Sequence, residues 1–215
     1  MIMIAALTRA FGRNHTRENE DAIQDVLLLL YLLDKAGNAV TDKDPFQAKV
    51  KLMKLVYLAE KSMAEMGFKG FNFFFNVYKH GPSSKELLKT LDDLQKKHLI
   101  HLDDKSSSIV LTDRGRMTIR DFIETSGAEN KKILSVVDDV VGKYAGMTTQ
   151  QILDSVYAME VTPMYSEKKV NIGDAVKSGV RTRLLMRLDE SDTKKKLEVS
   201  PDWVETLNVI MNPAF

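Results

Sequence analysis

The sequence predicts a mainly helical protein that carries one small β-hairpin. Apolar residues recur at intervals of three and four through most of the chain, which is the period of buried helix faces. Helix-starting pairs, a capping residue followed by proline, occur at Asp44-Pro45 and Ser200-Pro201. Two short apolar runs at 100–102 and 108–111 flank a polar connection and predict the hairpin. The order of elements over 71–115 is that of a winged helix-turn-helix, so we expect a winged helix-turn-helix-like N-terminal domain followed by a helical C-terminal extension.

The composition limits the function classes. The chain has 215 residues, a net charge of +1 and no cysteine. This length suits one large or two small domains, and the lack of cysteine excludes disulfides, thiolate metal sites and cysteine nucleophiles. Such a composition fits a cytoplasmic protein. Because the net charge is near zero, any contact with DNA must come from a local basic patch.

The N-terminal third predicts an arm and two buried helices. Residues 1–19 lack the basic start and cleavage site of a secretory signal, and we expect a mobile or partner-dependent arm. A helix over 20–35 is apolar nearly all round at 26–33, a run too short for the roughly 20 residues that span a bilayer, so no membrane contact is expected. Gly37 ends it. The next helix, over 46–66, closes at Gly67. Lys51, Lys54 and Lys61 fall on a different face from its expected buried side chains, which are Leu52, Leu55, Val56, Ala59, Met63 and Met66.

The middle of the chain predicts the winged-helix elements. Aromatic residues alternate with asparagines over 71–78, which predicts an extended segment whose rings pack in the core rather than form a base-stacking platform. After a sharp turn at 80–84, Ser83 and Glu86 form an S-x-x-E capping box that starts the candidate recognition helix. Its apolar stripe comprises Leu87, Leu91, Leu94 and His98. The wing follows, and a helix then runs from Thr112 to about residue 124, with Met117, Ile119, Phe122 and Ile123 as its apolar positions.

Residues 125–127 are the clearest boundary, so we divide the chain into an arm (1–19), a winged-helix-like domain (20–125) and a helical region for oligomerisation or partner binding (126–215). The last contains helices at 128–144, from a Thr148–Gln151 capping box to about 159, and at 203–211. Its polar stretch over 165–200 fits either a strand pair or a flexible arm. The helix at 128–144 is long and apolar enough to form a homodimer contact, although packing within the chain explains it too.

Catalytic and metal-binding motifs are missing. The sequence contains no P-loop, GxGxxG, HExxH or GxSxG motif. His98 and His101 are poorly spaced for joint chelation, and the paired aspartates at 92–93, 103–104 and 138–139 point to different faces of their elements. We therefore expect no catalytic residues, no metal and no cofactor, and not an enzyme.

A basic stripe on the candidate recognition helix is the main functional candidate. In a winged helix this helix enters the major groove of DNA. The residues expected to contact phosphates or bases are Ser83, Ser84, Lys85, Lys89, Thr90 and Lys96, with Arg114, Arg116 and Arg120 beyond the wing. Asp92 and Asp93 precede Lys96 and Lys97 by four residues, so ion pairing within the helix explains the lysines equally well. The two explanations stay open at this point.

Three stretches carry a resemblance to known families: K-L-M-K-L-V-Y-L at 51–58, Y-K-H-G-P-S-S at 78–84, and L-T-D-R-G at 111–115. Together they resemble a group of small prokaryotic proteins described as predicted transcriptional regulators. They are more distantly similar to the SocA-like antitoxin (Panacea) domain, which typically has Pro-Val where this chain has Pro82-Ser83. The resemblance covers about 20–125 and supplies no catalytic residues. It implies a DNA-binding winged-helix-type transcriptional regulator or, as the alternative, an antitoxin-like protein-interaction module that docks a partner through the aromatic turn.

Overall fold

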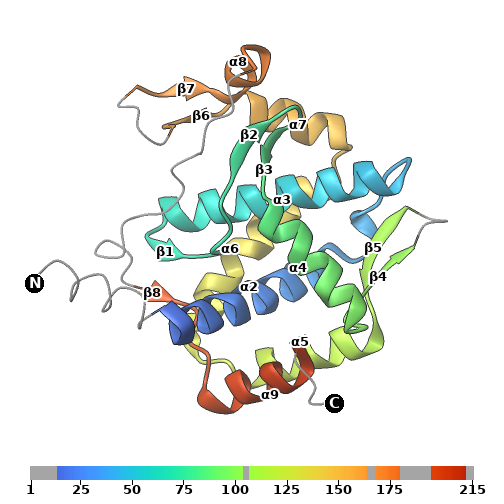
Figure 1. Ribbon diagram of the computed structural model, residues 1–215, viewed down its shortest axis with the longest axis vertical. Coiled ribbons are helices and arrows are strands. Elements are labelled where there is room, and N and C mark those ends of the chain that lie inside the picture. Colours follow the sequence, from blue (N-terminus) through green and yellow to red (C-terminus); the bar gives the residue numbers. More distant parts are fainter. Residues whose placement is uncertain (1–13, 104–106, 164–167, 180–194, 212–215) are drawn as a thin grey trace, which may run out of the picture.

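The computed structural model describes residues 14–103, 107–163, 168–179 and 195–211. It is mainly helical, with small two-stranded sheets around the helices (Figure 1). The helices are α2 (Asn14–Ala36), the 3-10 helix η1 (Gly37–Ala39), α3 (Pro45–Glu65), α4 (Lys85–Lys96), α5 (Asp113–Thr125), α6 (Ala128–Tyr144), α7 (Thr149–Tyr157), α8 (Ile172–Lys177) and α9 (Pro201–Met211). The strands are β1 (Phe68–Lys69), β2 (Asn76–Tyr78), β3 (Gly81–Ser83), β4 (Ile100–Asp103), β5 (Ser108–Leu111), β6 (Glu160–Val161), β7 (Val170–Asn171) and β8 (Lys195–Lys196).

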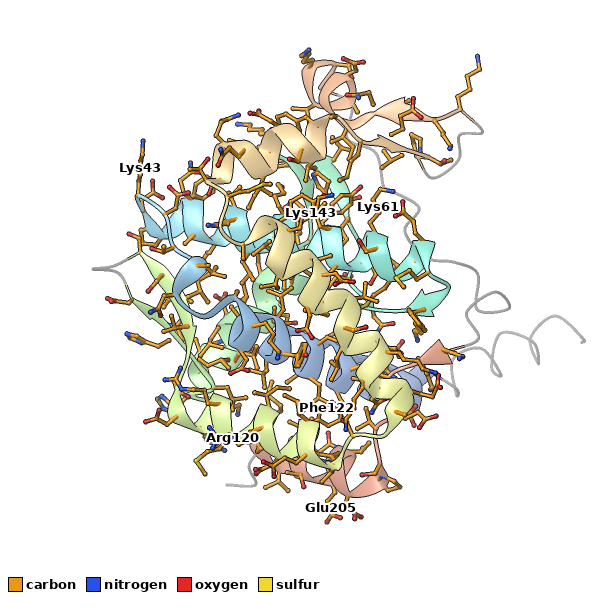
Figure 2. The ribbon with its side chains drawn as sticks, turned by 180° about the vertical axis from the view of Figure 1, so that it is seen from behind. Lys43, Lys61, Arg120, Phe122, Lys143 and Glu205 are labelled. Carbon is orange, nitrogen blue, oxygen red and sulfur yellow. The ribbon has the colours of Figure 1, made fainter. Side chains whose placement is uncertain are left out.

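Two helices, α2 and α3, form the centre of the molecule. Every residue from 23 to 33 of α2 and from 51 to 60 of α3 is buried. A helix that is apolar nearly all round must be covered on all sides. The helix α6 packs across both, as the view from behind shows (Figure 2). One continuous hydrophobic core therefore includes residues from α2 to α9.

The predicted helix starts and stops are largely confirmed. Asp44 accepts a hydrogen bond from the amide of Gln47 at 2.9 Å, and Pro45 is the first helical residue of α3. The Thr148–Gln151 capping box is present at the start of α7. Gly67 follows α3 with a φ of +74°. One predicted buried position is wrong, since Met66 is 60% exposed, and Met117, an apolar position of the helix that follows the wing, is 61% exposed.

The predicted hairpin at 100–111 is confirmed. Strands β4 and β5 pair antiparallel, with Ile100 opposite Leu111 and Asp103 opposite Ser108. The amide of Ile109 also donates to the carbonyl of Val40 at 3.0 Å, which ties the hairpin to the end of α2 through η1. The winged helix-turn-helix interpretation of the order α4, β4, β5, α5 stays a prediction.

The first described helix reaches into the predicted arm. Helix α2 begins at Asn14, so the last residues of the predicted arm are helical, and residues 1–13 lie outside the described residues. Within 165–200, β7 pairs antiparallel with β6 and β8 pairs parallel with β1, while 164–167 and 180–194 lie outside the described residues. The apolar side chains of α6 are buried within the chain. They are therefore used in the core rather than presented to a second copy.

In the described ranges, no helix combines the length and the hydropathy that a membrane crossing requires.

Candidate functional site

The turn that carries the G-P-S-S motif is a β-hairpin. Strands β2 and β3 pair antiparallel, with Val77 opposite Pro82 and Tyr78 opposite Gly81, so 79–80 form a two-residue turn. Gly81 has a φ of +76°, a backbone conformation that glycine adopts without strain. A side chain at Gly81 would also meet the ring of Tyr157 in α7, since an added Cβ would lie 3.0 Å from it. The glycine therefore serves both the turn and the packing of α7 on the hairpin.

Two side chains of α3 hold this hairpin. The ammonium group of Lys54 donates to the carbonyl of Pro82 at 2.5 Å, and both groups are buried. The sulfur of Met53 accepts a hydrogen bond from the amide of Ser84 at 3.3 Å. The K-L-M-K-L motif of α3 and the G-P-S-S motif of the hairpin therefore contact each other directly.

Burial at this contact lowers the pKa of Lys54. Lys54 is 2% exposed, and desolvation lowers the pKa of its ammonium group to about 7. Although Lys54 occupies a different stripe of α3 from the leucines, it is as buried as they are. The sequence contains a signal for this, because α3 is apolar on every side over 52–59 and leaves no solvent-facing stripe at that level.

A polar cluster holds the start of α3 against α7. The carboxylate of Asp42 accepts hydrogen bonds from the hydroxyl of Thr149 and from the amide of Lys43. Lys51, also expected on the non-core face, is 5% exposed and lies near Asp42. Burial lowers the pKa of Lys51, and the charge of Asp42 partly offsets this shift. The second lysine of the motif is thus structural as well.

Three aromatic residues that precede the hairpin are buried in the core. Phe71, Phe73 and Phe75 are each at most 4% exposed. The ring of Phe75 meets that of Tyr57 edge-on, with centroids 5.3 Å apart. The prediction that this run packs in the core is confirmed.

Exposed rings lie on the hairpin and at the neighbouring start of α3. Phe46 is 54% exposed and Tyr78 is 45% exposed. The exposed His80 meets Phe46 edge-on at a centroid distance of 5.7 Å. We call Phe46, Tyr78 and His80 the hairpin surface. The alternation through 71–78 places Tyr78 on the opposite side from the buried phenylalanines, so its exposure could have been predicted from the sequence.

The start of α4 differs from the predicted capping box. The N-cap is Ser84, whose hydroxyl accepts from the amide of Leu87, while Ser83 pairs with Asn76 in the hairpin. The carboxylate of Glu86 accepts a hydrogen bond from the amide of Phe74 at 2.7 Å and none from the cap residue. The β3 strand extends through Ser83, which moves the helix start by one residue. Ser84 is fully buried, so its side chain serves the cap.

The basic residues expected to contact DNA differ in whether they have a partner within the chain. Lys85 and Lys89 are exposed and pair with no group in the described part of the chain. Lys96 lies 3.5 Å from Asp93. Beyond the wing, Arg114 donates to the carbonyl of Lys97 at 3.2 Å and Arg116 lies 3.4 Å from Asp113.

Thr90 donates its hydroxyl to the carbonyl of Glu86, Arg120 is exposed, and His98 is exposed rather than part of the apolar stripe of α4. Contact between these residues and DNA stays a prediction.

Among the residues that the structure describes, no three histidine, aspartate or glutamate side chains are grouped to hold a metal ion.

Comparison with known proteins gives one family match. The model of the antitoxin SocA-like Panacea domain matches residues 52–160, just over half of the chain. The match includes most of α3, the β2–β3 hairpin, α4, the β4–β5 hairpin and α5 to α7. No curated protein and no solved structure matches the chain significantly.

Proposed function

This chain belongs to the SocA-like antitoxin family of Panacea domains, and on that premise we propose that it acts by binding a protein toxin. The proposal makes the chain a binding module and gives it no reaction to catalyse. It agrees with the lack of catalytic motifs in the sequence.

The hairpin surface is the observation that carries this proposal. Exposed aromatic rings supply much of the binding energy at protein interfaces because they bury large areas with few rotatable bonds. Here Tyr78 and His80 belong to a hairpin that Lys54 and Met53 fix to α3, and Phe46 belongs to α3 itself. A rigid, partly apolar surface loses little conformational entropy when a partner binds.

A DNA-binding regulator is the second candidate. Lys85 and Lys89 favour it, since both are exposed on α4 without an ion-pair partner among the described residues. The other basic groups favour it less, because Lys96 and Arg116 have acidic neighbours and Arg114 bonds a backbone carbonyl. Charges engaged in this way neutralise phosphates less effectively.

Photo-crosslinking tests the proposed toxin contact. A benzoylphenylalanine at position 78 is expected to capture one protein in native cells, and the same residue at Met117, which is 61% exposed on α5, is expected not to. Expression of the captured protein alone should stop growth, and co-expression of the wild-type chain should restore it.

The variant Phe46→Ala/Tyr78→Ala should bind the purified toxin at least about 30-fold more weakly, which is the loss expected for one interface hot spot. Because both side chains are exposed, its unfolding free energy should stay within about 1 kcal/mol of wild type. Undiminished toxin binding by this variant would remove the hairpin surface from the proposal.

The same preparations test DNA binding. A regulator would bind mixed genomic fragments at about 50 mM salt, and log affinity would fall with log salt by about 0.9 for each phosphate neutralised. Lys85→Ala/Lys89→Ala would flatten that slope. This result, together with a captured protein that does not stop growth, would favour DNA over a toxin.

A further inference from the structure

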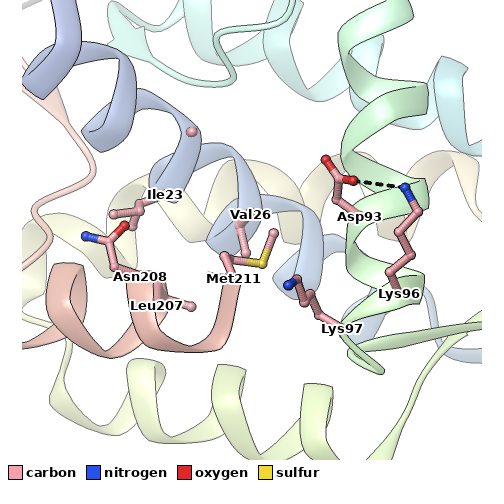
Figure 3. Close-up of a pocket in the computed structure, with 9 residues that line it drawn as sticks. Ile23, Val26, Asp93, Lys96, Lys97, Leu207, Asn208 and Met211 are labelled. Atoms are coloured by element: carbon pink, nitrogen blue, oxygen red, sulfur yellow. Dashed lines mark hydrogen bonds and ion pairs between the residues drawn. The ribbon is translucent and has the colours of Figure 1, made fainter. Parts of the chain in front are cut away.

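Helix α9 packs on α2 with one side and leaves another side open to solvent. Its inner side contributes Leu207 and Met211 to a hollow of about 400 Å³ between α2, α4 and α9, which Ile23 and Val26 of α2 also line (Figure 3). Of the residues of α9, all of which the structure describes, Leu207 alone is buried. The apolar Val209 is 63% exposed. The side of α9 that carries Val209 is therefore available to bind another segment.

The open side of α9 lines a second hollow, of about 640 Å³. Glu20 of α2 and Val199, which precedes α9, also line it. The α9 residues in its lining recur at intervals of three and four, so they form one stripe of the helix. They are Pro201, Val204, Glu205 and Asn208, with Val209 next to Asn208. More than half of the lining residues are apolar, so an occupant must present apolar side chains of its own.

Every charged residue that lines this second hollow in the described part of the chain is acidic. The two are Glu20 and Glu205. Glu205 has no hydrogen-bond or ion-pair partner among the described residues. Glu20 lies 3.5 Å from Lys196, but both side chains are 54% exposed, so water screens this pair. Residues 197–211 also contain three acidic residues and no lysine or arginine. The occupant must therefore carry positive charge.

The segment that precedes α2 has the complementary composition. Residues 1–13 contain two arginines, Arg9 and Arg13, and no acidic residue. They also contain a set of large apolar side chains, which are Met1, Ile2, Met3, Ile4, Leu7 and Phe11. The segment joins α2 at Asn14, six residues before Glu20, which is about 9 Å along a helix. Its length is ample to reach along α9, which spans roughly 16 Å.

From this composition and this attachment point we propose that residues 1–13 bind the open side of α9 in the same chain. Their apolar side chains cover Val209, and Arg9 pairs with Glu205. A segment attached beside the hollow has an effective concentration in the millimolar range, which favours it over a separate partner of the same chemistry. The inference is independent of the proposed toxin contact, because it shares no residue with the hairpin surface.

Thiol labelling tests the inference on the full chain, which has no cysteine of its own. The thiol introduced by Val209→Cys should react with a maleimide about tenfold faster when the chain also carries Leu7→Asp/Phe11→Asp, because the segment no longer covers it. Met117→Cys is the matched control, since residue 117 is 61% exposed on α5 and does not line the hollow. Its rate should be the same with and without the two changes in the segment. Equal rates at position 209 would overturn the proposal.

A charge swap tests the ion pair. Glu205→Arg should speed the labelling at position 209, and the addition of Arg9→Glu should restore slow labelling, which a misfolded chain could not do. Asp202→Arg makes the same change of charge on α9 at an exposed residue outside the hollow, and it should leave the rate unchanged. Failure of Arg9→Glu to restore protection, or equal acceleration by Asp202→Arg, would show that no such pair forms.

Disulfide trapping identifies the chain that supplies the segment. Mild oxidation of Leu7→Cys/Val209→Cys should give a disulfide within one chain, because this bond needs Cα atoms within about 7 Å of each other. Leu7→Cys/Met117→Cys should give none. A disulfide-linked dimer on a non-reducing gel would place the segment of a second copy in the hollow and overturn the assignment to the same chain.

Discussion

Alanine at position 115 is expected to destabilise the protein by about 3 kcal/mol or more, because a backbone atom occupies the space its side chain needs. An added Cβ would lie 2.1 Å from the carbonyl oxygen of Leu99 and 3.1 Å from its carbonyl carbon. That oxygen also accepts the amide of Thr112 at 3.1 Å, so it is fixed where α4 ends and α5 begins. Relief of the clash would separate these two segments.

Gly142→Ala is the matched control, since both glycines are helical and no atom lies within 4 Å of a Cβ added at Gly142. Helix propensity alone should stabilise that variant by about 0.5–1 kcal/mol. Urea unfolding of the two variants separates the cost of the backbone clash from the gain in helix propensity. A loss below about 1 kcal/mol at position 115 would mean that α5 does not approach Leu99 this closely.

The L-T-D-R-G motif shows what local chemistry can predict. The cap at Thr112 follows from the sequence, and the structure places the hydroxyl of Thr112 3.1 Å from the amide of Gly115. The reason for the glycine does not follow, because the clash comes from residue 99 in another element. Caps, helix spans and the wing pairing depend on neighbouring residues, so the sequence predicts them well.

The sequence-based predictions fail where the conformation or burial of a residue depends on a partner in another helix or strand. The S-x-x-E pattern predicts Ser83 as the cap of α4, but pairing with Asn76 extends β3 through Ser83 and leaves the cap to Ser84. The helical spacing puts Lys54 on a different face from the apolar side chains, yet it is buried, because its acceptor lies in the hairpin. A single sequence shows neither partner.

In the candidate surfaces too, local features can be predicted from the sequence, and contacts between distant elements cannot. The alternation over 71–78 predicts that Phe71, Phe73 and Phe75 are buried, and the exposure of Tyr78 follows from the same alternation. The contact between Phe46 and His80 joins residues from α3 and the hairpin turn, so only the structure reveals it. The hollow between α2, α4 and α9 likewise depends on α9, which is distant in the sequence from the other two helices.

Replacement of Lys54 by methionine is expected to change how stability depends on pH. Burial lowers the pKa of Lys54 to about 7 in the folded protein, against about 10.4 in the unfolded chain. Between these values the unfolded chain binds a proton that the folded protein does not, so stability rises with pH. The lysine should contribute a rise of about 2 kcal/mol between pH 7 and pH 9, and the methionine variant should lack it.

Lys61→Met provides the control on the same helix, because Lys61 is only partly buried and pairs with Glu65 near the surface. Its pH profile should match that of wild type in urea unfolding. Measurement below pH 9 avoids Tyr31 and Tyr57, whose pKa values burial raises, because their contribution begins only near pH 10. A methionine variant with the wild-type slope would show that Lys54 is not desolvated.

Loss of the proton from Lys54 at high pH should not weaken its contact with the hairpin. A neutral amine still donates a hydrogen bond, so loss of the proton removes the cost of burying a charge and leaves the bond from Lys54 to Pro82 in place. The hairpin surface should therefore be held at least as firmly at pH 9 as at pH 7. In the methionine variant the buried carbonyl of Pro82 loses this donor at every pH. Weaker toxin binding by this variant, with Phe46 and Tyr78 intact, would then measure what fixation of the hairpin contributes.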